Sequence, residues 1–489
     1  MKSIRDYFAA DKKLGFINAA FSARATGESA WLLIGLTGTG FAVGAQAFWI
    51  VLGEMIGVGG AWLFMSRRFK RLTDRYDAIT VPDYLEARLR DSGHALRLIA
   101  AGALIVFVPI YAGSQVHATG KAFHAFLGLD HLVGAVIGFL VVLFYITRGG
   151  FVAVVWSDVF QGLLMGLGLV GLPIVGLLEL GGVTDLIGTL RDVSPDHLAL
   201  DGGNGWTHMT FVTIFGFAAI GIGFLGSPQV FVRFISLRSE KEINKGAAVA
   251  LLWTLFALSG AVLVGMVGRA LYDRATIGGD SDNVLPFMSQ DLLHPFLAGL
   301  FIAMVLSAIM STIDSLLVVA SSAGVRDYWQ KTMHPEMTDE TLVKLSQRVT
   351  LALAFVAFAI GLGLILRDPE EEVFWLIIFG WSGIAATFCP TVIMSLFWSG
   401  LTARGARCSM VAGFIAVPFN KFAAPFILEA AGWTEGTAFL TALDVLLPSF
   451  VAAFLVGIVV SLTDRRGRAR MEGVREELEE AAARSAPDA

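Results

Sequence analysis

Long apolar runs alternate with short polar stretches from one end of the chain to the other. Many of these runs reach the roughly 20 residues that an α-helix needs to cross a bilayer. The pattern predicts an all-α membrane protein with about twelve transmembrane segments. The predicted segments are 14–43, 46–66, 95–122, 131–147, 151–180, 209–230, 246–272, 295–324, 347–366, 372–398, 405–428 and 439–463.

The first and the sixth predicted segments are interrupted. Irregular backbone at membrane depth is tolerated only where it lines a buried cavity, and interrupted helices at matching positions of two halves indicate a transporter's binding site. Close helix packing is the alternative explanation for the glycines. The interrupting residues are Ser22, Arg24, Thr26, Glu28 and Ser29 in the first segment, and Gly221, Gly223, Gly226 and Pro228 in the sixth.

The eighth predicted segment carries hydroxyl groups on one face. In SAIMSTIDSLLVVAS (307–321), Ala308, Ser311, Thr312 and Ser315 are spaced as neighbours on a helix, and Asp314 lies on their flank. An aspartate inside a membrane segment indicates a functional site. Hydroxyl oxygens and freed carbonyls suit a hard cation such as sodium. Taken singly, each hydroxyl has an alternative role, which is to bond back to a carbonyl of its own helix.

Composition and charge narrow the class of protein. With 55% hydrophobic and 16% charged residues, the chain is not a soluble protein. Neither nucleophile–base pairs nor metal-ligand spacings nor phosphate-binding loops stand out, so we expect no enzyme, no nucleic-acid partner and no obligate protein partner. Basic residues gather in the links on one side, which predicts a plasma (inner) membrane protein with both termini cytoplasmic. These links include SRRFKRLTDR (66–75) and Arg233, Arg238, Lys241 and Lys245.

The domain division follows the end of the apolar pattern. Residues 1–463 form the predicted transmembrane domain, and 464–489 form a charged cytoplasmic tail. We expect the tail to be a short solvated helix with a frayed end. The outer loop 181–208 is long enough for an extracellular cap.

Several stretches resemble the sodium:solute symporter family in the same order, from Asp6 to about Thr463, and the pattern is closest to the family's bacterial sodium/proline symporters. The resemblance implies a LeuT-type fold of two inverted five-helix repeats, with broken first and sixth helices and alternating access. The stretches are DYFAADKKLGFINAAFSARATGESAWLLIGL, ITVPDYLEARL, VPIYAGSQ, RGGFVAVVWSDVFQG, GIGFLGSPQVFVRFISLRS and SAIMSTIDSLLVVASS.

The resemblance also implies ligands. The main sodium would be held by Ala25, Glu28, Ala308, Ser311 and Thr312, through carbonyls of the first three and hydroxyls of the last two. Some members have a second sodium, whose matching residues here are Asp158, Ser311, Asp314 and Ser315; for Asp158 a packing role is the alternative. The implied substrate residues are Thr26, Gly27, Glu28, Ser29, Trp31, Tyr111, Gln115, Ile220 and Phe224.

The predicted function is sodium symport of a small organic solute, most plausibly an amino acid or a proline-like zwitterion. Departures from the proline-specific pattern put proline itself in doubt. The aspartate of that pattern falls on Gly27, and a carboxylate follows at Glu28, which we expect to hold a substrate ammonium or a proton unless it only pairs with Arg24. Proton-coupled or sodium-independent transport, suggested by Glu28 and Glu54, is the alternative, and a symporter-like solute sensor is another.

Overall fold

The computed structural model describes residues 4–146, 151–334 and 336–483, and its regular elements there are helices. Ten described stretches are long and apolar enough to cross a membrane, and His131–Phe144 is a shorter one. One of the ten, Trp31–Arg75, reverses its direction at Gly44 (φ 60°) and therefore contains parts of two predicted segments. The predicted all-α membrane architecture is confirmed, and the last residue of segment 131–147 lies outside the described residues.

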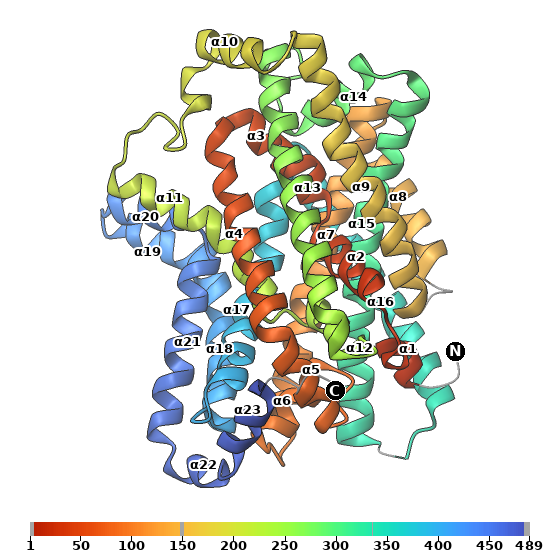
Figure 1. The fold of residues 1–489 in the computed structure, drawn as a ribbon, viewed down its shortest axis with the longest axis vertical. Helices are drawn as coiled ribbons and strands as arrows, with labels where there is room; N and C mark the ends of the chain where they lie inside the picture. The colour runs from red at the N-terminus through yellow and green to blue at the C-terminus, as the bar shows by residue number, and fades with distance from the viewer. Residues whose placement is uncertain (1–3, 147–150, 335, 484–489) are drawn as a thin grey trace, which may run out of the picture.

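The long helices run between the two ends of the molecule, with α1, α5, α6 and α23 at one end and α3 and α10 at the other (Figure 1). The first half of the chain forms α1 (Ile4–Ala9), α2 (Phe16–Gly27), the π-helical turn η2 (Trp31–Leu36), α3 (Thr37–Val43), α4 (Phe48–Gly59), η4 (Gly60–Met65), α5 (Ser66–Arg75), α6 (Val81–Leu89), α7 (Ala95–Leu127), α8 (His131–Ile146), α9 (Phe151–Leu180), α10 (Val183–Val193), α11 (His208–Ala219), η6 (Ile220–Leu225), α12 (Pro228–Ser236) and α13 (Ile243–Leu271).

The second half begins with the short helix α14 and continues with long helices packed against the first half. Within it, α17 is the most enclosed candidate span, with 83% of its apolar window buried. The elements are α14 (Val284–Leu292), α15 (Pro295–Ser322), η9 (Ala323–Met333), α16 (Asp339–Arg367), α17 (Val373–Phe397), α18 (Ala403–Pro418), η10 (Phe419–Ala423), α19 (Ala424–Ala430), α20 (Thr434–Leu443), α21 (Leu446–Thr463), α22 (Arg465–Arg470) and α23 (Val474–Ala482).

Some predicted boundaries were wrong. The basic link 66–75 is helical, because α5 continues α4 without a break. The last predicted segment is interrupted at Asp444, whose φ of 57° ends α20 before α21 begins. The predicted outer cap contains α10, and it contacts the α3–α4 turn through a hydrogen bond from Trp49 Nε1 to the carbonyl of Leu200 (2.9 Å).

The tail is not a solvated helix. Val474 and Leu478, one helical turn apart, are buried where α23 packs against α5. Arg71 of α5 donates to the carbonyl of Ala481 (3.1 Å), and Arg75 pairs with Glu480 (2.6 Å). The short apolar face of α23 is thus wide enough to cover one helix. The expected frayed end, 484–489, lies outside the described residues.

Glycines bring α4 close to the irregular turn η6. A Cβ on Gly57 would lie 1.9 Å from the carbonyl oxygen of Gly221, and a Cβ on Gly53 would lie 2.2 Å from that of Ala218. Without a hydrophobic driving force between helices in a bilayer, such small-residue contacts let van der Waals packing hold helices together. This contact fixes the middle of α4, which carries Glu54, beside the break in segment six.

We therefore expect Gly57→Ala to destabilise the protein by about 1–3 kcal/mol, because overpacking forces the two backbones apart. Thermal unfolding in detergent, followed by tryptophan fluorescence, measures the effect. Gly102→Ala on α7 is the matched control, since nothing lies within 4 Å of a Cβ built there. Equal melting temperatures for the two variants would show that the α4–η6 contact is not tight.

Candidate functional site

The first break lies in the middle of segment one. The helix α2 ends at Gly27 because the chain becomes extended at Glu28 (φ −102°, ψ 128°), and helical turns resume at Trp31. Side chains take over the backbone hydrogen bonds that are lost. Thr312 Oγ1 donates to the carbonyl of Glu28 (3.3 Å), and Trp31 Nε1 donates to that of Gly27 (3.0 Å).

The second break, in segment six, was also predicted. There α11 gives way to the 3₁₀-helical turn η6, and α12 starts at Pro228 after a bend at Gly226. The indole Nε1 of Trp381, on α17, donates to the freed carbonyl of Ile220 (3.0 Å). Both breaks are therefore stabilised by neighbouring helices, as irregular backbone in a membrane requires.

The five residues predicted for the main sodium site lie together. Ser311 Oγ is 2.9 Å from the carbonyl oxygen of Ala25 and 3.0 Å from that of Ala308. Thr312 contributes its hydroxyl beside the carbonyl of Glu28, as described above. Ser311 thus bonds to its own helix and to the broken helix at once. The donor set consists of oxygens from two elements, and this chemistry fits a hard cation such as sodium.

A fixed positive charge lies beside this oxygen cluster. Arg233, on α12, is fully buried and donates to Thr26 Oγ1 (2.6 Å) and Ser315 Oγ (2.8 Å). Its guanidinium also pairs with Asp158 (3.3 Å), whose carboxylate accepts a hydrogen bond from Ser22 (2.5 Å). Asp314, on α15, interacts with the same guanidinium through its charge. These residues form what we call the Arg233 cluster: Ser22, Thr26, Asp158, Arg233, Asp314 and Ser315.

This cluster bears on three interpretations made from the sequence. Arg233 is not part of a basic link at the membrane surface, because α12 carries it into the bundle. In the described conformation its guanidinium lies between Asp158 and Ser315, where the resemblance implied a second sodium. Thr26, expected near the substrate, bonds to Ser315 (2.9 Å) in this cluster.

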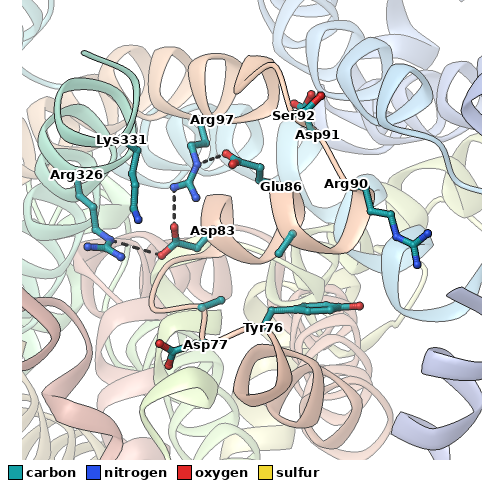
Figure 2. Close-up of a pocket in the computed structure, with 12 residues that line it drawn as sticks. Tyr76, Asp77, Asp83, Glu86, Arg90, Asp91, Ser92, Arg97, Arg326 and Lys331 are labelled. Atoms are coloured by element: carbon teal, nitrogen blue, oxygen red, sulfur yellow. Dashed lines mark hydrogen bonds and ion pairs between the residues drawn. The ribbon is translucent and has the colours of Figure 1, made fainter. Parts of the chain in front are cut away.

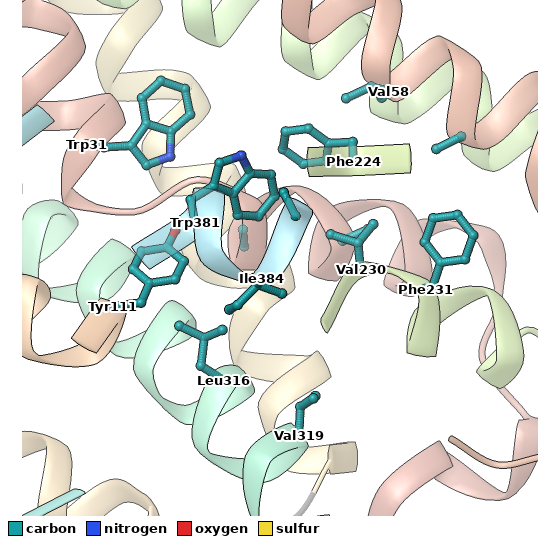
Figure 3. Packing of buried hydrophobic residues seen from close by; sticks show 14 of the residues in the cluster. Trp31, Val58, Tyr111, Phe224, Val230, Phe231, Leu316, Val319, Trp381 and Ile384 are labelled. Carbon is teal, nitrogen blue, oxygen red and sulfur yellow. The ribbon is translucent and has the colours of Figure 1, made fainter. Parts of the chain in front are cut away.

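Most of the other expected substrate residues gather around the aromatic side chains shown in Figure 3. The Phe224 ring lies against Gly27, where a Cβ would come within 2.5 Å of it. Trp381 joins Phe224 (ring centroids 5.0 Å apart) to Tyr111 (6.5 Å). Further along α7, Gln115 Nε2 donates to Ser29 (3.0 Å), so α7 contacts the break in segment one.

Trp381 and Arg233 belong to this region but were not predicted from the sequence. Trp381 lies in an apolar run with many aromatic residues, and nothing in that pattern distinguishes it. Arg233 did carry a signal, since a single arginine follows Pro228 by five residues, within one and a half turns of a helix start.

Comparison with known proteins identifies the family of this chain. The sequence profile of the sodium:solute symporter family matches residues 7–413. The high-affinity proline transporter PutP of Bacillus subtilis is 34% identical over 417 residues, which cover 85% of this chain and 86% of the relative.

The chain belongs to the sodium:solute symporter family.

Other relatives agree with this assignment. The sodium/proline symporter of Staphylococcus aureus is 32% identical, with 95% of this chain and 89% of the relative covered. The osmoregulated proline transporter OpuE of Bacillus subtilis is 30% identical, with 97% and 93% covered. This chain is therefore a membrane transporter and not an enzyme, with sodium as the coupling ion and a small solute as cargo.

Solved structures establish the fold. An outward-open, substrate-bound Na⁺-coupled sialic acid symporter superposes with a TM-score of 0.77 at 19% identity, covering 95% of this chain and 93% of that one. MhsT in complex with L-phenylalanine gives a TM-score of 0.55 at 15% identity, with 91% and 98% covered. These likenesses confirm the predicted LeuT-type fold.

The symporter also has a polar hollow of about 550 Å³ at the end that carries α1 and α23 (Figure 2). Arg97 of α7 pairs with Asp83 of α6 and with Asp327 of η9, each at 2.6 Å. Burial acts to raise the pKa of Asp83, but the Arg326 and Arg97 guanidiniums outweigh it and hold that pKa below its usual value. These ion pairs tie α6 to the continuation of α15 in the described conformation.

Arg233→Gln is expected to destabilise the symporter by about 3–5 kcal/mol, because it leaves the buried Asp158 carboxylate without its guanidinium. Adding Asp158→Asn should recover a large part of this loss, since the two side chains are in contact. Thermal unfolding in detergent of both single variants and the double variant measures the coupling. Arg348→Gln, at an exposed position on α16, is the control. A double variant no more stable than Arg233→Gln would contradict the pairing.

Proposed function

We propose that this symporter uses the sodium gradient to import a small amino acid or a related ammonium-bearing solute, with its main sodium held by Ala25, Glu28, Ala308, Ser311 and Thr312. The relatives named above are proline transporters, which supports a cargo about as large as proline. Alternating access would then open the aromatic region around Phe224 and Trp381 to each side in turn.

One observation carries the proposal. The hydroxyls of Ser311 and Thr312 reach across from an intact helix to the carbonyls of Ala25 and Glu28 at the break in another. Sodium bound there would join α15 to the broken part of α2. Because Glu28 and Ser29 at the same break are among the expected substrate residues, ion binding and solute binding would depend on one backbone conformation.

The proposed setting is the plasma (inner) membrane, with both termini cytoplasmic and without an obligate partner chain. The basic stretch 66–75 supports this orientation, because it lies at the same end of the bundle as α1 and α23. The transport domain would comprise residues 1–463, followed by the tail 464–489.

Ser311→Ala and Thr312→Ala should each raise the sodium concentration for half-maximal uptake roughly tenfold or more, because a hydroxyl ligand to a charged group contributes about 1.5–3 kcal/mol. Sodium activation of solute uptake in proteoliposomes measures the shift. Ser321→Ala is the matched control, since Ser321 is also buried on α15 and its hydroxyl bonds back to Val318 (3.0 Å). Unchanged sodium activation in both site variants, with normal protein levels, would exclude this site.

The Arg233 cluster yields a second prediction about sodium. With the guanidinium between Asp158 and Ser315, we expect a single coupling sodium and a Hill coefficient of about 1, because that coefficient cannot exceed the number of sites. Asp158→Asn should slow uptake without altering the Hill coefficient. A wild-type coefficient near two that falls to one in Asp158→Asn would instead assign a second sodium to Asp158.

A further inference from the structure

The polar residues of α2 divide between two opposite faces of the helix. Ser22 and Thr26 are four residues apart and lie on the face that meets the Arg233 cluster. Arg24, two residues after Ser22, is rotated about 200° from it and faces the other way, where it pairs with Glu28 just beyond the end of the helix. Arg24 there reaches Glu54 of α4, with Nη2 3.3 Å from Oε2. We call Arg24, Glu28 and Glu54 the acidic triad.

The acidic triad is enclosed. Arg24 is 1% exposed and both glutamates are 0% exposed. Arg24 pairs with Glu28 as well as with Glu54. The guanidinium also lies 4.5 Å from the ring centre of Phe224 and 5.6 Å from that of Trp253. Phe224 belongs to the expected substrate region, so the triad borders the place where a solute would bind.

The charges of the triad do not balance. It has one guanidinium and two carboxylates, and burying an uncompensated charge away from water costs several kcal/mol. A purely structural ion pair needs only one of the two glutamates. The Arg233 cluster, on the other face of α2, likewise holds two carboxylates, Asp158 and Asp314, and one guanidinium. The proposed sodium, held in part by the carbonyl of Glu28, lies next to both regions and supplies one positive charge against their two excess negative charges. One further positive charge, from a cationic solute or a proton, is still needed.

Polar atoms around the triad also lack partners. Among the described residues, Arg24 Nε and Nη1 and Glu54 Oε1 are buried and make no hydrogen bond. Buried polar groups are paired in the great majority of cases. Hydrogen-bond donors and acceptors that lack partners and lie close together would suit a ligand that carries both an acidic and a basic group.

We propose that the acidic triad selects a solute of net positive charge, an amino acid with a second basic group, over a neutral zwitterion such as proline. This inference rests on the proposed function, and it names the class of cargo. The carboxylate of the solute would accept hydrogen bonds from Nε and Nη1 of Arg24. The two cationic groups of the solute would pair with the two glutamates. Each charge of the buried site then has an opposite charge in the solute.

The test compares charged and neutral cargo in proteoliposomes with an imposed sodium gradient. Wild-type protein should take up L-ornithine or L-lysine with at least roughly tenfold higher kcat/KM than L-proline, equivalent to about 1.4 kcal/mol. Glu54→Gln leaves one guanidinium and one carboxylate, so it should reverse the preference toward L-proline. Electrophysiology on supported membranes gives a second readout, because a cationic solute adds one charge per solute to the charge carried by sodium.

Controls separate this effect from misfolding. Glu429→Gln removes an exposed carboxylate on α19 and should leave the ratio unchanged. Glu28→Gln lowers the charge of the triad in the same way as Glu54→Gln and should shift the ratio in the same direction. If Glu54→Gln does not fold, judged by gel filtration and thermal unfolding, Glu28→Gln and the wild-type charge per solute still decide the question.

Different results would contradict the inference about cargo charge and the proposed function. The inference is overturned if L-proline uptake depends on sodium but L-ornithine does not inhibit it, and if folded Glu54→Gln or Glu28→Gln keeps the same selectivity. That result leaves the proposed function intact. Uptake of these solutes that does not depend on sodium refutes the proposed function itself.

Discussion

Every backbone carbonyl inside a bilayer needs a partner, and the site depends on how the two broken helices meet this requirement. A helix that stops in mid-membrane exposes carbonyl oxygens that lipid cannot satisfy. Here hydroxyl and indole groups from α15, from α17 and from segment one itself satisfy them, through Thr312, Trp381 and Trp31. One of these carbonyls, that of Glu28, is also proposed to bind sodium. At Glu28, the interruption of the helix therefore supplies an oxygen for the ion.

Local patterns made much of this predictable. The glycines before Pro228 and the polar run from Ser22 to Ser29 located both breaks, and the hydroxyl spacing on α15 located the proposed ligands. Contacts between distant segments were not predictable in the same way. Arg233 was placed in a surface link, because a basic residue near a segment end is usually exposed, and only tertiary packing brings it to Asp158. The docking of α23 likewise depends on a surface of α5 that its own sequence does not reveal.

The two faces of α2 give the bundle two separate charged regions. Hydroxyls, Arg233 and two aspartates lie on one side of the helix, and Arg24 with two glutamates lies on the other. The break at Glu28 belongs to both, because its carbonyl faces Thr312 while its side chain pairs with Arg24. A rotation of this short segment would alter both regions at once, which gives ion and solute a shared structural element.

The unbroken helix from Phe48 to Arg75 has a mechanical consequence. At 1.5 Å per residue it is about 40 Å long, and α23 is fastened to its far end. A tilt of about 5° around Gly53 would move α5 by roughly 3 Å, since about 20 residues of rigid helix amplify it. Such a tilt at the level of the acidic triad would therefore displace α23 by a similar distance. A fluorescent label on α23 would report motion at the middle of the membrane from outside it.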